Sequence, residues 1–109
     1  MKKIIALAAA VLLTVATTAS AGNARSLCES INGFARAAMT ARQNGVEMVE
    51  LLRAVDTHTP DEPDHKMLIS IVRIAYSKQR YSTESMKQRA ITDFTNETMS
   101  ACLDNLLDQ

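Results

Sequence analysis

The chain has little glycine and proline, and it lacks internal repeats and glycine-rich motifs. Its 109 residues include three glycines and two prolines, and no alternation of apolar and polar residues is long enough to predict a β-strand. Neither a G-x-S-x-G nucleophile turn nor a glycine-rich phosphate loop is present. These absences argue against the common serine hydrolases and phosphate-loop enzymes, and they leave helices as the expected regular structure.

Residues 1–21 have the three parts of a secretory signal peptide. Lys2 and Lys3 give a positive start, an uncharged apolar run follows, and a stretch of small residues ends at Ala21. The apolar run is too short for a permanent membrane helix, so an uncut anchor is the weaker alternative. We therefore expect removal of the leader and a single mature domain, 22–109, in the periplasm of a bacterium or in its medium.

Basic and acidic residues balance, with 12 of each kind. Because Lys2 and Lys3 leave with the leader, 10 basic and 12 acidic residues remain in the mature domain, a net charge of −2. This charge gives no general attraction to nucleic acid or to anionic lipid. We expect neither a nucleic-acid partner nor stable membrane insertion of the mature domain.

Cys28 and Cys102 are the only cysteines, and they lie near opposite ends of the mature domain. In an oxidising compartment they allow a single intramolecular pairing. Closing a loop of about 75 residues stabilises a fold by roughly 4 to 5 kcal/mol in the chain-entropy model. We predict this internal disulfide, with two free thiols or an intermolecular bond as the alternatives.

Apolar residues recur with the period of an α-helix in four segments. They are Leu27, Ile31, Phe34, Ala38 and Ala41; Met48, Leu51, Leu52 and Val55; Met67, Leu68, Ile71, Val72 and Ala75; and Met86, Ala90, Ile91, Phe94, Thr98, Cys102 and Leu106. The third segment, with Ile69 and Ile74 to one side of its stripe, has the widest apolar band, which predicts the central, most buried helix. Both cysteines fall on apolar faces, of the first and last segments. The fold prediction is all-α, a small four-helix bundle closed by one disulfide.

Three breaks separate the expected helices. The first helix should run from Ser26, after a frayed start at 22–25, to a stop at Asn44-Gly45. The second should end before a main loop at 56–65, where Thr59-Pro60-Asp61-Glu62 forms a capping box for the third. Residues 77–82 break the pattern before a fourth helix that opens at Ser82-Thr83-Glu84.

The loop at 56–65 contains both histidines and several carboxylates, which are ligand types for zinc or nickel. Their spacing matches no specific metal motif, so a solvated acidic loop is the preferred interpretation. We expect no metal, no cofactor and no catalytic residues.

Charge is uneven in the second half of the chain. Between 73 and 89 the basic residues are Arg73, Lys78, Arg80, Lys87 and Arg89, whereas the charged residues from 93 onward are Asp93, Glu97, Asp104 and Asp108. Complementarity within the domain is the default explanation. The alternative is a recognition surface, since arginine and tyrosine are enriched at interface hot spots. The candidate binding residues are Tyr76, Lys78, Arg80 and Tyr81, although Tyr76 fits equally a core position with its hydroxyl at the rim.

The methionines of the mature domain lie on or beside the apolar stripes. They are Met39, Met48, Met67, Met86 and Met99. Filling gaps in the core is the predicted role, and an adaptable surface for varied clients is the alternative.

A pattern of residues along the chain resembles small exported proteins of proteobacteria and their prophages that have no assigned activity. It comprises Cys28, Ala41-Arg42-Gln43-Asn44-Gly45, Ile71-Val72-Arg73-Ile74-Ala75-Tyr76, Phe94 and Cys102. In size, helicity and single disulfide the chain is also similar to periplasmic immunity proteins against cell-wall-cleaving toxins and to periplasmic acid-stress chaperones. We predict an exported protein-binding domain, an inhibitor or immunity factor, with an acid-stress chaperone as the alternative and a small enzyme as the third possibility.

Overall fold

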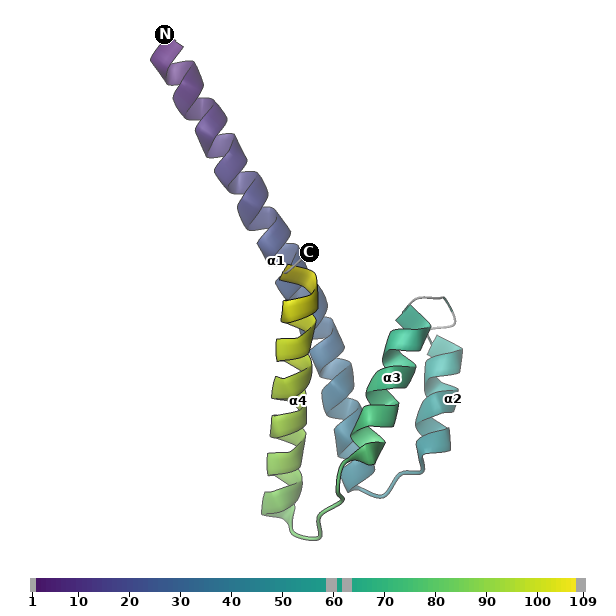
Figure 1. Ribbon diagram of the computed structural model, residues 1–109. Coiled ribbons are helices and arrows are strands. Elements are labelled where there is room, and N and C mark those ends of the chain that lie inside the picture. The colour runs from purple at the N-terminus through teal and green to yellow at the C-terminus, as the bar shows by residue number, and fades with distance from the viewer. Residues whose placement is uncertain (1, 59–60, 62–63, 108–109) are drawn as a thin grey trace.

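The protein is all-α. The computed structural model describes the backbone of residues 2–58, 61 and 64–107, and the side chains of 23–58, 61 and 64–105. The helices are α1 (Lys2–Gln43), α2 (Met48–His58), α3 (Asp64–Ser77) and α4 (Glu84–Leu107), and the described residues contain no strand (Figure 1). The predicted fold class is therefore confirmed. Within the described part of the chain, no helix is long and apolar enough to cross a membrane.

The central helix is α1. One side of α1 packs against α4, another packs against α3, and α2 packs on α3 (Figure 1). The prediction that the segment around Met67–Ala75 is the most buried helix was wrong, because α3 covers α1 on one side and leaves Ile74 half-exposed. Successive helices alternate in direction, so the α1–α2 turn and the α3–α4 loop meet at one end of the domain.

The predicted disulfide is confirmed and joins α1 to α4. Cys28 and Cys102 lie 74 residues apart in sequence, with their Cα atoms 5.6 Å apart. The Cys28 side chain is completely buried, whereas Cys102 is half-buried. The covalent link is toward the end of the domain opposite the α3–α4 loop.

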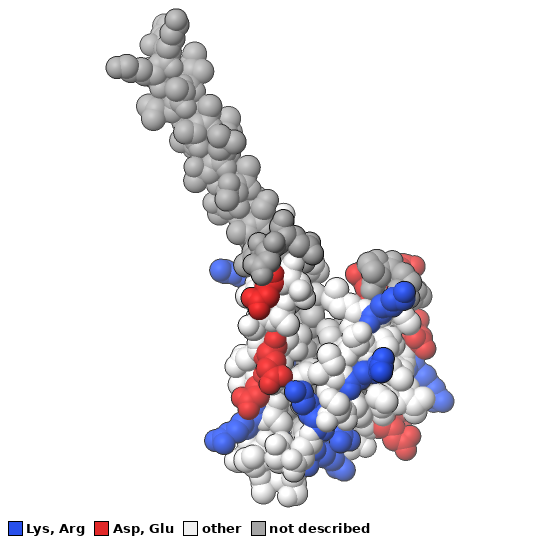
Figure 2. Space-filling model, in the orientation of Figure 1, with Lys and Arg blue, Asp and Glu red and all other residues white. Residues whose placement is uncertain are grey.

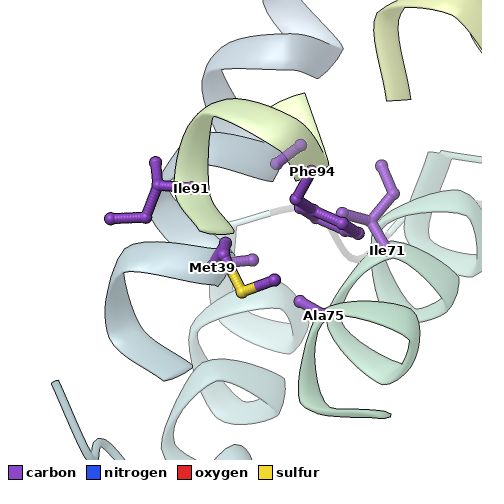
Figure 3. Close-up of a cluster of buried hydrophobic side chains, with 7 residues drawn as sticks. Met39, Ile71, Ala75, Ile91 and Phe94 are labelled. Atoms are coloured by element: carbon purple, nitrogen blue, oxygen red, sulfur yellow. The ribbon is translucent and has the colours of Figure 1, made fainter. Parts of the chain in front are cut away.

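Small residues on α1 bring the three main helices close together. The buried cluster consists of Ala35, Ala38, Met39, Ile71, Ala75, Ile91 and Phe94. Figure 3 shows Phe94 pointing from α4 toward Ile71 and Ala75 of α3, with Met39 of α1 beside them. Burial of this apolar surface, at about 25 cal/mol per Å², drives the packing of α3 and α4 onto α1. Met39 thus fills the core as predicted, but Met48 and Met67 are exposed, so for them the prediction was wrong.

Gly45 ends α1, as the stop signal predicted. The Val46 N–H donates to the Ala41 carbonyl (3.0 Å) and the Gly45 N–H to that of Arg42 (3.2 Å), which is a Schellman motif. This motif places Gly45 at φ 81°, a conformation that favours glycine. A Cβ on Gly45 would also lie 2.7 Å from Nη2 of Arg80, so the guanidinium rests directly on the turn.

Three helix boundaries differ from those expected. Residues 22–25, expected to be a frayed start, are instead part of α1, which begins at Lys2. The second helix continues to His58, where the Thr57 hydroxyl donates to the Arg53 carbonyl (3.0 Å) and prolongs the last turn. The third begins at Asp64. The predicted capping box at Thr59–Glu62 lies, except for Asp61, outside the described residues.

The fourth helix begins as predicted, because the Met86 N–H donates to the Thr83 hydroxyl (3.3 Å) in an N-cap. The leader remains a prediction, since its side chains lie outside those the structure describes.

Candidate functional site

The four predicted binding residues lie where the α1–α2 turn meets the α3–α4 loop. Tyr76 is half-buried and its hydroxyl donates to the Val46 carbonyl (2.7 Å), as in the core-and-rim alternative. The Arg42 guanidinium lies 5.6 Å from the centre of the Tyr76 ring. Burial raises the pKa of Tyr76 and outweighs the opposing effect of the Arg42 charge. Tyr76 therefore supports the turn with a neutral hydroxyl.

The other three predicted residues also contact their own chain. Nε of Arg80 donates to the Gln43 carbonyl (3.2 Å), and Nζ of Lys78 lies 3.3 Å from Oε2 of Glu97. The Tyr81 backbone N–H donates to Oε1 of Gln43 (2.8 Å), and its side chain is half-buried. The structure thus brings all four residues to one end of the domain, where their contacts connect the α1–α2 turn, the α3–α4 loop and α4. A binding role for them stays a prediction.

Gln43 organises this end of the domain, and sequence reasoning missed it. Its side chain is fully buried at the last residue of α1. Nε2 donates to the Gln79 carbonyl (2.9 Å), and Oε1 accepts from the Tyr81 N–H. The Gln43 carbonyl accepts from Arg80 and from Nζ of Lys87 (2.9 Å). The available signal was an amide four residues after Met39, on the apolar face beside a helix stop.

Replacing Gln43 with leucine should destabilise the fold by about 2 to 3 kcal/mol, because a backbone carbonyl and a backbone N–H lose their partners. Chemical denaturation of the Gln43→Leu protein measures this loss. Gln79→Leu is the matched control: Gln79 is exposed and contacts Gln43 through its backbone, so its effect should stay within about 0.5 kcal/mol. Equal losses in the two variants would contradict a special role for the buried amide.

An apolar groove lies between α3 and α4, with α1 as its floor. Its volume is about 360 Å³, within the usual range for ligand sites. The lining residues are Leu27, Ile31, Met67, Ile71, Ile74, Phe94, Glu97, Thr98, Ala101, Cys102 and Asn105. Leu27, Met67 and Ile74 are 50%, 41% and 51% exposed. Grouped large apolar side chains at a concave surface are typical of binding sites.

The groove exists because α3 and α4 each pack on α1, whereas the backbones of α3 and α4 come close to each other at few points. On α3 the apolar band extends past the buried edge at Val72 and Ala75 to Met67 and Ile74, which no other helix covers. On α4 the facing residues are small or polar, except Phe94. Sequence reasoning assigned this whole band to the core; its width, greater than one neighbouring helix can cover, was the available signal.

A second, smaller pocket of about 190 Å³ lies beside the α3–α4 loop, and its lining includes Lys78, Tyr81 and Glu97. Among the described residues, no three His, Cys, Asp or Glu side chains come together. Nε2 of His65 and Oδ1 of Asp56 lie 2.7 Å apart and connect the start of α3 to α2. In comparisons with known proteins, no family model, no curated protein and no solved structure matches the chain. The resemblance to small exported proteins therefore stays a prediction, and the groove is the main basis for a functional argument.

Proposed function

We propose that this protein is an exported protein-binding domain that receives part of its partner in the groove between α3 and α4. The observation that carries the proposal is the grouping of Leu27, Met67 and Ile74, each about half-exposed, around one concavity. Covering apolar surface contributes about 25 cal/mol per Å² to association. A partner side chain placed in the groove would bury apolar surface from several helices at once.

The rigidity of the groove supports the proposal, because both helices that form its sides, α3 and α4, are fixed to α1. The Cys28–Cys102 bond ties α4 to α1, and the buried cluster around Met39 ties α3 to α1. A preformed site binds with a smaller cost in conformational entropy than one that must order. Such a rigid surface suits an inhibitor or immunity factor, and it requires no catalytic group.

A periplasmic chaperone is the second candidate, and one observation favours it. Met48 and Met67 are both exposed apolar side chains, and methionine adapts to surfaces of different shape. A chaperone would contact many clients weakly, whereas an inhibitor would contact one partner in a stoichiometric complex.

Photo-crosslinking from the groove tests the proposal. A photoreactive amino acid placed at Met67 in the exported protein should give an adduct with another periplasmic protein, and the same group at Met48, which does not line the groove, should not. The adduct should be lost in Ile74→Lys, which puts a charge into the groove. It should persist in Val49→Lys, a matched change at an apolar residue of α2 with 44% exposure.

The adduct pattern separates the candidates. A single adduct of fixed stoichiometry supports the inhibitor, and many weak adducts support the chaperone. Adducts from a photoreactive group at Tyr81 but not at Met67 would contradict the groove and favour the surface around Tyr76–Tyr81. No adduct at any position would contradict protein binding.

A further inference from the structure

The two walls of the groove carry opposite charge. On α3, the exposed Lys66 and Arg73 directly precede the lining residues Met67 and Ile74 in sequence. On α4, the lining residue Glu97 is acidic, and the exposed Asp93 and Asp104 lie on the same side of the helix, four residues before it and seven after it. Figure 2 shows basic side chains over α3 and acidic ones over the later part of α4 on this face. We call Lys66 and Arg73 the basic wall, and Asp93, Glu97 and Asp104 the acidic wall.

Helical geometry places these charges at the outer rims of the groove. At about 100° per residue, Lys66 and Arg73 fall on the side of α3 away from the buried Val72 and Ala75. The acidic wall falls on the side of α4 away from the buried Ile91 and Thr95, and the buried Phe94 lies between the two sides. The apolar floor is therefore bordered by one rim of each sign. The uneven charge along the sequence thus corresponds to basic residues on the α3 side of the groove and acidic residues on the α4 side.

One residue of the acidic wall, Glu97, already contacts a cationic side chain. Nζ of Lys78, from the α3–α4 loop, lies 3.3 Å from Oε2 of Glu97. Among the described residues it is the one ion pair at the groove, and none joins the basic wall to the acidic wall. Apart from Glu97, which contacts Lys78, the charged residues of both walls can therefore face an occupant.

Resting on the proposed function, we infer that the occupant is an amphipathic helix of a partner protein, with acidic side chains on the flank that faces α3 and basic ones on the flank that faces α4. An apolar stripe repeating every three to four residues would lie on the floor. Its flanks would meet walls of opposite charge. Turning a helix end over end exchanges its flanks, so the walls also fix the direction in which the helix lies.

A second copy of this chain fits less well. Two copies facing each other would oppose one concavity to another and leave both floors uncovered. A single helix, in contrast, is convex and about 10 Å wide.

Three synthetic helical peptides of about 18 residues test the inference. All share one composition and one leucine stripe. In the first, glutamates line one flank and lysines the other; in the second, the flanks are exchanged; in the third, both charges are mixed on each flank. A nitroxide at the peptide N-terminus reports direction, because it broadens the NMR signals of nearby amides of the exported protein.

We expect the first two peptides to bind with similar Kd and in opposite directions. The third should bind about three- to tenfold more weakly in low salt and broaden signals at both ends, and the difference should shrink in about 0.5 M salt. Arg73→Glu should reduce the preference for one direction. Arg53→Glu, an equal charge change at an exposed residue of α2, should leave it intact.

The outcomes distinguish the two proposals. If all three peptides bind equally and Ile74→Lys abolishes their binding, the charge inference is overturned and the groove stands. If no peptide binds, or if Ile74→Lys has no effect, both proposals fail. A dimer in sedimentation equilibrium that Ile74→Lys dissociates would make a second copy the occupant and overturn the inference.

Discussion

Reduction of the Cys28–Cys102 bond is expected to lower the free energy of unfolding by about 4 to 5 kcal/mol. The bond closes a loop of 74 residues that includes most of the folded domain, and releasing it restores that conformational freedom to the unfolded chain. Small domains have total stabilities of only about 5 to 15 kcal/mol. Much of the protein should therefore unfold on reduction at 37 °C.

Urea denaturation of the protein, with and without reductant, measures this effect. The double variant Cys28→Ala/Cys102→Ala is the control, because it removes the cross-link without leaving a reactive thiol. It should match the reduced wild type and should not respond to reductant. A reduced protein whose unfolding midpoint stays near that of the oxidised protein would show that the cross-link contributes little.

Truncation of Phe94 is expected to cost about 3 to 5 kcal/mol, the usual range for a buried phenylalanine replaced by alanine. Its ring is 3% exposed and packs in the cluster that joins α1, α3 and α4. Phe94 also lines the groove, so Phe94→Ala should both destabilise the fold and open the floor of the groove. Thermal unfolding followed by circular dichroism measures the first effect.

Phe34 is the matched control, because it is the only other phenylalanine and it is partly buried against the same cluster. Phe34→Ala should cost about 1 to 2 kcal/mol, since its ring loses less buried surface. An equal loss of stability in Phe34→Ala and Phe94→Ala would contradict a core centred on the cluster around Met39.

The helices could be predicted because their signals lie within short stretches of sequence. The disulfide could be predicted because only one pairing is possible. Periodicity shows within one segment, and Gly45 and Thr83 mark boundaries through bonds that span only a few residues. The cysteines are only two, so one internal pairing exists. The leader's composition predicts export by the same local logic.

The arrangement of the helices could not be predicted, because it depends on which faces meet. The wide apolar band around Ile71 was compatible with a central helix, yet its Met67–Ile74 edge borders a groove. Small residues at Ala35 and Ala38 made α1 the helix that its neighbours approach most closely.

The role of Gln43 was hidden for the same reason. Its partners, Gln79 and Tyr81, lie 36 and 38 residues further along the chain. Tyr76 and Arg80 were predicted to bind a partner, and the contacts that the structure shows for them are with their own chain.

Cys102 belongs to the lining of the groove as well as to the covalent link. The oxidation that joins the two helices therefore also shapes the surface on which a partner would settle. A newly made chain in a reducing cytosol would carry every lining side chain without the frame that aligns them. For the proposed binding function, the groove would be complete only after the Cys28–Cys102 bond has formed.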